Sequence, residues 1–202
     1  MNSIFEPWGR SVALFAVLGL LAVTFSRGQA DPAASVTHVP VVFSGGHETV
    51  GEDRGRPVIL IAGALGVPPE VFRAAFRQVR PAPAGTAPDP EQVQRNKAAL
   101  LAALSPYGVT NERLDEVSNY YRYQRSRGEL WPTQPAAAYV VVSGGRVTGF
   151  VVTSGGSGYS SPPTVVVPGL KDSAVSASLA FSTEFEHNGA VADISIQPGE
   201  KR

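Results

Sequence analysis

The sequence predicts an α+β fold, with an N-terminal helical part of two helix-turn-helix-like pairs followed by a small antiparallel β-hairpin unit. Two β-branched runs, over residues 140–142 and 147–153, flank Gly144 and Gly145, which supply the positive φ angles of a tight hairpin. Upstream of them, apolar residues recur at helical spacing between prolines. We therefore expect a helical domain over residues 55–135 and an antiparallel β unit over residues 136–198.

Charge and cysteine content exclude several classes of function. The chain has 202 residues, with 17 Lys and Arg balanced by 17 Asp and Glu, so no net field attracts nucleic acid or an anionic membrane. We therefore expect no nucleic-acid partner. The absence of cysteine excludes disulfides and thiolate chemistry, so packing alone has to stabilise the fold.

Residues 1–30 have the pattern of a signal peptide. Arg10 precedes an uninterrupted apolar run over residues 12–25, and Gly28, Gln29 and Ala30 offer the small residues of a cleavage site. The run is shorter than the roughly 20 residues of a membrane-spanning helix. We expect an exported protein, in the periplasm, at the cell surface or secreted. An uncleaved membrane anchor is the alternative, and only then do we expect contact with a membrane.

Residues 31–54 are predicted to be an irregular leader with one short strand over residues 39–43. Its polar loop holds His47, Glu48 and Asp53, which are metal-binding residue types and form the best candidate metal site. Their spacing is neither alternating nor helical, however. The competing interpretation is a solvated loop that leads into the first helix.

The first predicted helix pair follows this loop. Residues 58–65 are apolar on every side, which is typical of a central helix, and Pro57 suits its first turn. Gly66 and Pro68 end this helix, and Pro69 begins the next. Residues 80–90 form a connector rich in proline and alanine that cannot continue a helix.

The second pair begins at a predicted capping box formed by Asp89 and Gln92, and Pro106 interrupts it. Thr110 is expected to cap the last helix. The resulting outline resembles a helix-turn-helix, which raises the question of DNA binding. The second helices lack the ordered set of donors and basic residues that DNA recognition requires, so we interpret the pairs as packing units.

The segment 118–132 interleaves aromatic and basic residues. Aromatic faces and guanidinium forks suit a ligand surface, and the candidate binding residues are Tyr120, Arg122, Tyr123 and Trp131. Aromatic residues on a helix more often pack in a core. The alternative interpretation is therefore that this segment attaches the helical part to the sheet.

A second hairpin is predicted near the C-terminus. Gly145, Val147, Phe150 and Val152 have counterparts in Gly189, Val191, Ile194 and Ile196. The step of three residues from the first valine to the next apolar residue implies a β-bulge in both copies, because a regular strand alternates every second residue. Asn188 and Gly189 are a hairpin signal, so we expect a tight turn there.

The motif Gly156-Ser157-Gly158-Tyr159, with Pro162 and Pro163 after it, resembles the glycine–tyrosine β repeat of phage tail proteins and large bacterial surface proteins. The likeness covers about one clear unit, residues 145–169, and a second unit that lacks the glycine–tyrosine corner. The whole layout also resembles small uncharacterised exported bacterial proteins. Neither resemblance implies a catalytic residue.

Catalytic motifs are largely absent from the sequence. No Gly-x-Ser-x-Gly elbow occurs, and a hydrolase using Ser157 or Ser160 with one of the three histidines has no positive support. We expect an exported, non-catalytic binding or structural module without a cofactor, whose partner is a cell-surface glycan or a protein. The alternatives are a metal-dependent extracytoplasmic enzyme that uses His47, Glu48 and Asp53, and a membrane-tethered accessory subunit.

Overall fold

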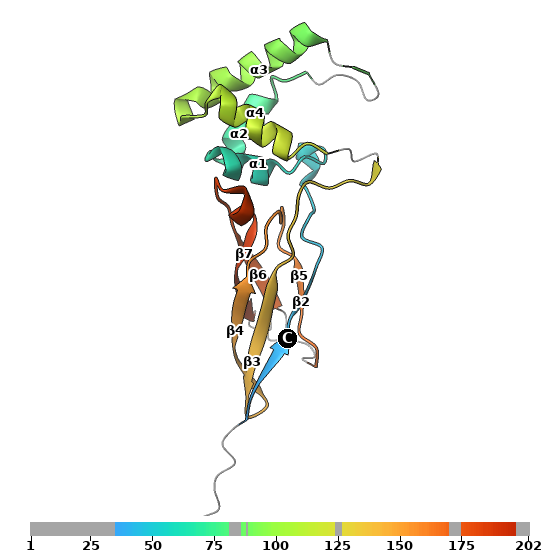
Figure 1. Ribbon diagram of the computed structural model, residues 1–202, viewed down its shortest axis with the longest axis vertical. Coiled ribbons are helices and arrows are strands. Elements are labelled where there is room, and N and C mark those ends of the chain that lie inside the picture. Colours follow the sequence, from blue (N-terminus) through green and yellow to red (C-terminus); the bar gives the residue numbers. More distant parts are fainter. Residues whose placement is uncertain (1–34, 81–85, 88, 124–126, 170–174, 197–202) are drawn as a thin grey trace, which may run out of the picture. The chain divides into compact units, whose positions relative to one another are not determined.

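A computed structural model describes residues 35–80, 86–87, 89–123, 127–169 and 175–196. The expected signal peptide, residues 1–30, lies outside these described residues. The helices are α1 (Val58–Leu65), α2 (Pro69–Phe76), α3 (Pro90–Leu104) and α4 (Asn111–Tyr120) (Figure 1). The strands are β1 (Val36–Pro40), β2 (Val42–Ser44), β3 (Ala137–Ser143), β4 (Arg146–Ser154), β5 (Thr164–Val166), β6 (Val175–Ala180) and β7 (Ala190–Ile196). The predicted α+β class is confirmed.

Local signals set the ends of the helices. Gly66 adopts a positive φ of 68° and ends α1, and Pro69 occupies the first turn of α2. Thr110 caps α4, because its hydroxyl accepts a hydrogen bond from the backbone N–H of Arg113. The helix starts and stops predicted for this region are confirmed. In the assembled structure α2 packs against α1 and α3, and α4 packs against α1.

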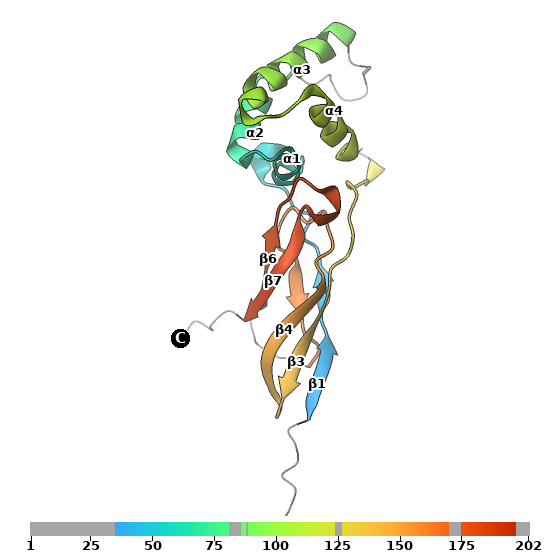
Figure 2. The ribbon, with the colours of Figure 1, turned by 60° about the vertical axis from the view of Figure 1, so that its left-hand side comes forward.

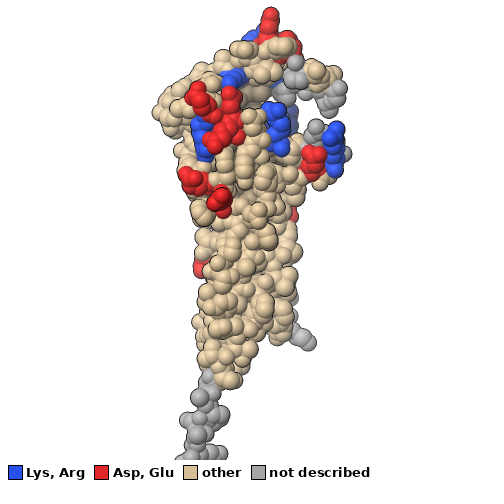
Figure 3. Space-filling model, in the orientation of Figure 1, with Lys and Arg blue, Asp and Glu red and all other residues tan. Residues whose placement is uncertain are grey.

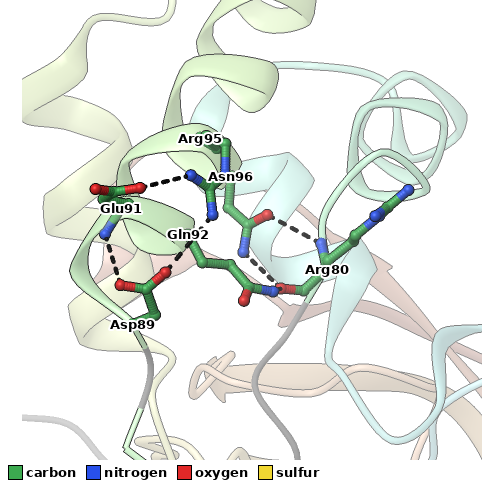
Figure 4. A network of polar contacts seen from close by, with 6 residues as sticks. All are labelled: Arg80, Asp89, Glu91, Gln92, Arg95 and Asn96. Carbon is green, nitrogen blue, oxygen red and sulfur yellow. Dashed lines mark hydrogen bonds and ion pairs between the residues drawn. The ribbon is translucent and has the colours of Figure 1, made fainter.

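The predicted capping box at α3 is only half formed. The Asp89 carboxylate accepts a hydrogen bond from the backbone N–H of Glu91, so the cap itself is present. Gln92 does not bond back to the cap; its amide instead donates to the Arg80 carbonyl at 2.6 Å, next to a second donor from Asn96 at 2.7 Å (Figure 4). These two amides attach the end of the α2 segment to α3.

The strands form three small antiparallel sheets, ordered β1–β3–β4, β2–β5 and β6–β7. β3 and β4 are joined by the two-residue turn at Gly144 and Gly145, with φ angles of 57° and 76°. This confirms the first predicted hairpin.

Both hairpins carry a bulge at corresponding positions. In β4 the pairing skips Thr148, since Val141 faces Gly149 and Val142 faces Val147. In β7 it skips Ala192, because Ser178 faces Asp193 and Leu179 faces Val191. The bulges predicted from the odd apolar spacing are therefore confirmed in both hairpins.

The β6–β7 connection differs from the prediction. Asn188 and Gly189 do not form a two-residue turn; residues 181–189 connect the strands, and they include the short 3₁₀ helix η4 (Phe185–His187). Asn188 has extended backbone angles and is fully buried. Its side chain has another use, described below.

The leader also differs from the prediction. Only one short strand was expected before the helices, yet residues 36–44 form both β1 and β2. β1 pairs with β3 and β2 pairs with β5, so strands that precede the helical segment lie beside strands that follow it (Figure 1). The helical segment is thus inserted into the β part between β2 and β3.

Two hydrophobic cores result. One lies among the helices and includes Leu60, Phe72, Leu104, Val117, Tyr121 and Trp131. The other lies among the strands and includes Val41, Val140, Tyr159, Val165, Val191 and Ile194. Charge is distributed unequally between these parts: Arg146 and Asp193 are the only charged residues in the described strands, and on the face shown in Figure 3 charged side chains gather over the helical segment.

Candidate functional site: the junction of helices and strands

The glycine–tyrosine corner holds the helical and β parts together. The Gly158 carbonyl accepts a hydrogen bond from the Trp131 indole N–H at 2.8 Å, and the backbone N–H groups of Gly158 and Tyr159 donate to the carbonyls of Asn188 and Gly189. The Tyr159 hydroxyl accepts a hydrogen bond from the Ala136 N–H at 2.9 Å. The corner thus joins the entry to β3 with the β6–β7 connection.

Asn188 links the β6–β7 connection to the helices, next to which that connection lies in Figure 2. Its side-chain oxygen accepts a hydrogen bond from the Ser182 N–H at 3.1 Å. Its side-chain amide donates to the Leu60 carbonyl at 2.7 Å and to the Tyr121 hydroxyl at 2.8 Å. Although Asn188 is fully buried, these three bonds give both polar atoms of its side chain a protein partner.

The aromatic–basic segment is placed mostly within this junction. Trp131 is buried, and Tyr123 packs edge-on against it with ring centres 5.4 Å apart. The Tyr123 hydroxyl donates to the Gly55 carbonyl. Arg122 is exposed. Of the four candidate binding residues, Trp131 and Tyr123 thus have structural partners, whereas Tyr120 lies at the edge of a groove.

That groove is an open cavity of about 1010 Å³. The Tyr120 ring stacks on Phe185 with centres 3.9 Å apart and an angle of 6° between the rings. The groove is lined by Tyr120, Gln134, Pro135, Ser154, Gly155, Gly156, Ser157, Glu184, Phe185, Glu186, His187 and Ala190. It therefore lies between the end of α4, the glycine corner and the β6–β7 connection.

Ser157 presents a hydroxyl to this groove. The residue is only 2% exposed, and its backbone N–H and carbonyl both pair with Gln134 at 3.0 Å. Within the described ranges, the Ser157 hydroxyl has no protein hydrogen-bond partner, and because no buried side-chain polar atom there lacks a partner, its oxygen keeps contact with solvent. A ligand in the groove can therefore bond to this hydroxyl in place of water.

The charges that line the groove are acidic. Glu184 and Glu186 are exposed carboxylates, and no Lys or Arg is among the lining residues. Burial, and to a smaller extent the nearby charge of Glu186, raises the pKa of Tyr120 above its ordinary value, so its hydroxyl stays protonated at neutral pH. The groove therefore offers several acceptors and a few neutral donors.

The three candidate metal ligands have separate partners. The His47 ring stacks on Tyr159, and its Nδ1 lies 3.2 Å from the Gly158 carbonyl. The Glu48 carboxylate accepts hydrogen bonds from the Ser161 hydroxyl and the Gly46 N–H; the first of these makes the largest contribution to lowering its pKa. The described residues contain no group of three or more His, Cys, Asp or Glu that could hold a metal ion.

Asp53 is the third of these candidates, and its side chain is only 5% exposed. Arg73 donates to both of its carboxylate oxygens, at 2.7 and 2.9 Å, in the bidentate arrangement typical of a strong ion pair. Asp53 thus links the loop before α1 to α2.

Ser157 and His187 line the same groove, but no hydrogen bond joins them. Ser160, the other serine considered, donates its hydroxyl to the Glu48 carbonyl at 2.8 Å. The geometry of these described residues thus provides neither serine with the adjacent base that nucleophilic catalysis needs.

Sequence reasoning missed the contribution of the β6–β7 connection. Glu184, Phe185 and Glu186 enter the groove because the connection is long and contains a 3₁₀ turn, whereas the Asn-Gly signal predicted a short turn. The alternating run from Val175 ends at Phe181, and the polar residues after it were the available sign of a longer loop.

Among the described residues, no single helix has the length and apolar content of a membrane span; α1 and α2 meet that test only as a pair bent by 107°. Comparison of the chain with known protein families, with curated proteins and with solved structures finds no match.

Proposed function

We propose that this chain is an exported, non-catalytic binding module that holds a glycan in the groove between Tyr120 and Ser157. The observation that carries the proposal is the groove itself, which the stacked Tyr120 and Phe185 rings line together with two carboxylates and the Ser157 hydroxyl. A ligand hydroxyl can bond to that serine in place of water.

The chemistry of the lining favours a neutral, hydroxyl-rich ligand. Glu184 and Glu186 accept hydrogen bonds from hydroxyl groups and repel phosphate or carboxylate. Gln134 also lines the groove, and a side-chain amide carries both a donor and an acceptor. The Tyr120–Phe185 pair provides an apolar wall against which the C–H face of a sugar ring can pack.

The junction supports this role, because a binding groove gains affinity when its walls are held in place before the ligand arrives. Asn188 fixes the β6–β7 connection to α1 and α4, and Trp131 fixes the glycine corner. The groove is thus built from segments far apart in sequence that are held by buried hydrogen bonds.

Export is part of the proposal and is supported by the signal-peptide pattern of residues 1–30. N-terminal sequencing of protein recovered from expressing cells tests it. A new N-terminus near Asp31 is expected. An intact Met1 would instead favour the membrane-tethered accessory subunit.

The groove is tested by retention of the full chain on insoluble bacterial cell-wall glycan. Ser157→Ala removes a hydroxyl that has no protein partner, so it should weaken retention by about tenfold while leaving the thermal unfolding midpoint unchanged. Glu186→Gln, which keeps the shape of the side chain, should weaken retention by several-fold. The matched control is Glu70→Gln on α2, an exposed acid outside the groove, which should not affect retention.

Equal retention of wild type, Ser157→Ala and Glu186→Gln would reject the groove as the binding surface. Loss of retention in Glu70→Gln as well would show that net charge, and not the groove, determines binding.

A further inference from the structure

We propose that a second, separate site at the start of the helical segment binds a multiply charged oxyanion, the phosphate or carboxylate group of a ligand, through Arg54, Arg56 and Arg77. The site is independent of the glycan groove and shares no lining residue with it.

The three arginines border one open cavity of about 310 Å³ between the loop before α1 and the end of α2. The cavity is lined by Glu52, Asp53, Arg54, Arg56, Val58, Arg73, Phe76, Arg77 and Val79. Four arginines and two acidic residues thus line one concave surface.

Arg73 forms ion pairs with both acidic residues of the cavity, Glu52 and Asp53. Its Nε lies 2.7 Å from Asp53 Oδ1 and 3.2 Å from Glu52 Oε1, and its Nη2 lies 2.9 Å from Asp53 Oδ2. No ion pair to Arg54, Arg56 or Arg77 occurs within the described residues. Three positive charges thus line the cavity without a carboxylate in ion-pair contact, although Arg56 donates to the Asp53 carbonyl and the Asp53 charge acts to raise its pKa.

Arg56 is held rigidly for such a role. Its guanidinium lies over the Phe76 ring, 4.3 Å from the ring centre, which fixes the plane of the group. Its burial, followed by the repulsion of Arg54, lowers its pKa, so the free protein bears a cost for keeping these charges together. A bound anion would remove that repulsion.

The backbone at Arg54 carries a second cost. Arg54 is the only described residue other than glycine with a positive φ, 50°, and it occupies the left-handed position that ends the short helix η1 (Gly51–Asp53). Glycine adopts this backbone conformation without strain, whereas a residue with a Cβ atom is strained in it. A charged side chain at a strained position beside a cavity is the pattern expected of a binding residue.

Arginine matches the proposed ligand group. Its planar fork donates two parallel hydrogen bonds to the oxygens of a phosphate or carboxylate, and several forks around one cavity complement a charge of two or more. The two possible groups share this chemistry, so the experiment has to compare them.

The test is calorimetric titration of the full-length protein with inorganic phosphate and, separately, with malonate. Sodium chloride keeps the ionic strength constant. We expect saturable binding of at least one anion, and the tighter of the two identifies the group. Arg54→Gly and Arg77→Gln should each weaken that binding by about tenfold.

Arg54→Gly also separates binding from folding. Because glycine is unstrained at this position, the variant should not lower the thermal unfolding midpoint of the free protein, so any loss of binding is not due to misfolding. The matched control, Arg146→Gln, removes an exposed arginine at the β3–β4 turn and should bind the anion as wild type does.

The proposal is overturned if neither anion binds beyond the effect of chloride, or if Arg146→Gln loses as much affinity as Arg54→Gly. Glycan retention by Arg54→Gly should remain at the wild-type level, which keeps a failure of this site distinct from a failure of the groove.

Discussion

At the scale of single residues, the junction depends on polar groups that have no access to water. The Asn188 amide provides both a donor and an acceptor to partners on α1, α4 and its own loop. Leaving a buried acceptor without its donor costs more free energy than the hydrogen bond itself contributes to stability. Substitutions that remove Asn188 should therefore lower the free energy of unfolding more than substitutions that remove one of its partners.

Asn188→Ala should reduce the free energy of unfolding by about 3 kcal/mol, because it removes the acceptor of the Ser182 N–H and the donors to the Leu60 carbonyl and the Tyr121 hydroxyl. Tyr121→Phe, which removes one hydroxyl, should reduce it by about 1 kcal/mol. Chemical denaturation of the single and double variants measures the coupling. In the Asn188→Ala background, Tyr121→Phe should have almost no effect; fully additive losses would contradict a direct bond.

Tyr121 also predicts a dependence of stability on high pH. Burial raises the pKa of Tyr121 to about 12, although its hydrogen bond from Asn188 acts in the opposite direction. Below pH 10 the hydroxyl is protonated in both folded and unfolded chains, so its full contribution is present. Between pH 10 and 12 only the unfolded chain releases the proton, and stability falls by an amount on the order of 2–3 kcal/mol.

The measurement is the free energy of unfolding as a function of pH for wild type and Tyr121→Phe. The decline above pH 10 should be shallower in Tyr121→Phe. Parallel curves for the two proteins would assign the decline to other groups.

The residue scale also shows where sequence reasoning succeeds. The alternative interpretation of the aromatic–basic segment, that it attaches the helical part to the sheet, agrees with Trp131, which belongs to the helical core and bonds to Gly158. Asn188 was interpreted as a turn residue because asparagine before glycine is a local signal, whereas its hydrogen bonds reach a helix more than a hundred residues earlier. The role of such a side chain depends on its distant neighbours.

At the scale of elements, the glycine corner is a site of close backbone approach. Gly156 has a φ of 62°, and a Cβ there would lie 2.3 Å from the Gln134 carbonyl oxygen and 2.7 Å from the Ala136 nitrogen. Gly144 has a similar φ of 57° in the β3–β4 turn, but a Cβ there would meet nothing within 4 Å. A comparison of alanine substitutions at the two positions therefore distinguishes the cost of backbone strain from the cost of a steric clash.

Gly144→Ala should therefore cost about 1 kcal/mol of stability, which is the strain of a left-handed alanine. Gly156→Ala should cost about 3 kcal/mol or more, since backbone atoms cannot move aside as a side chain would. Thermal unfolding of the two variants provides the comparison. Equal losses would mean that the corner relaxes to accept a side chain.

Elements differ in how much local sequence determines them. The helix starts at Pro69, Asp89 and Thr110 and the stop at Gly66 were predictable, because caps and proline act within one turn. The single strand predicted over residues 39–43 merged the end of β1 with β2, since the edge strand β1 gains its hydrogen bonds only from β3, far along the chain. The Thr148 and Ala192 bulges were predictable because spacing within one strand reveals them.

At the scale of the whole described molecule, the β part is discontinuous in sequence. β1 and β2 precede the helices and β3–β7 follow them, so a division of the chain at residue 136 separates strands that pair. The candidate groove has the same origin: Tyr120, Ser157 and Glu186 meet only after the helical and β parts have joined. Their proximity could not be predicted from local pattern.

A fragment of residues 136–198 should therefore lack a cooperative unfolding transition, because it lacks β1, β2 and the apolar contributions of Val39, Val41 and Phe43 to the β core. A fragment of residues 35–196 retains every described strand and helix and should unfold cooperatively. Circular dichroism during heating distinguishes the two. A sharp transition in the shorter fragment would show that β3–β7 form a stable unit without the N-terminal strands.

The buried indole of Trp131 is an intrinsic fluorescence probe of the contact between the helical and β parts. Its N–H donates a hydrogen bond to the Gly158 carbonyl, and its ring belongs to the helical core. The wavelength of its maximum fluorescence emission should therefore change when the two parts separate. Trp8 is the only other tryptophan in the sequence, and it falls within the predicted signal peptide. In the processed protein, a red shift of the fluorescence emission that precedes the loss of the circular dichroism signal would therefore show that the two parts separate before either part unfolds.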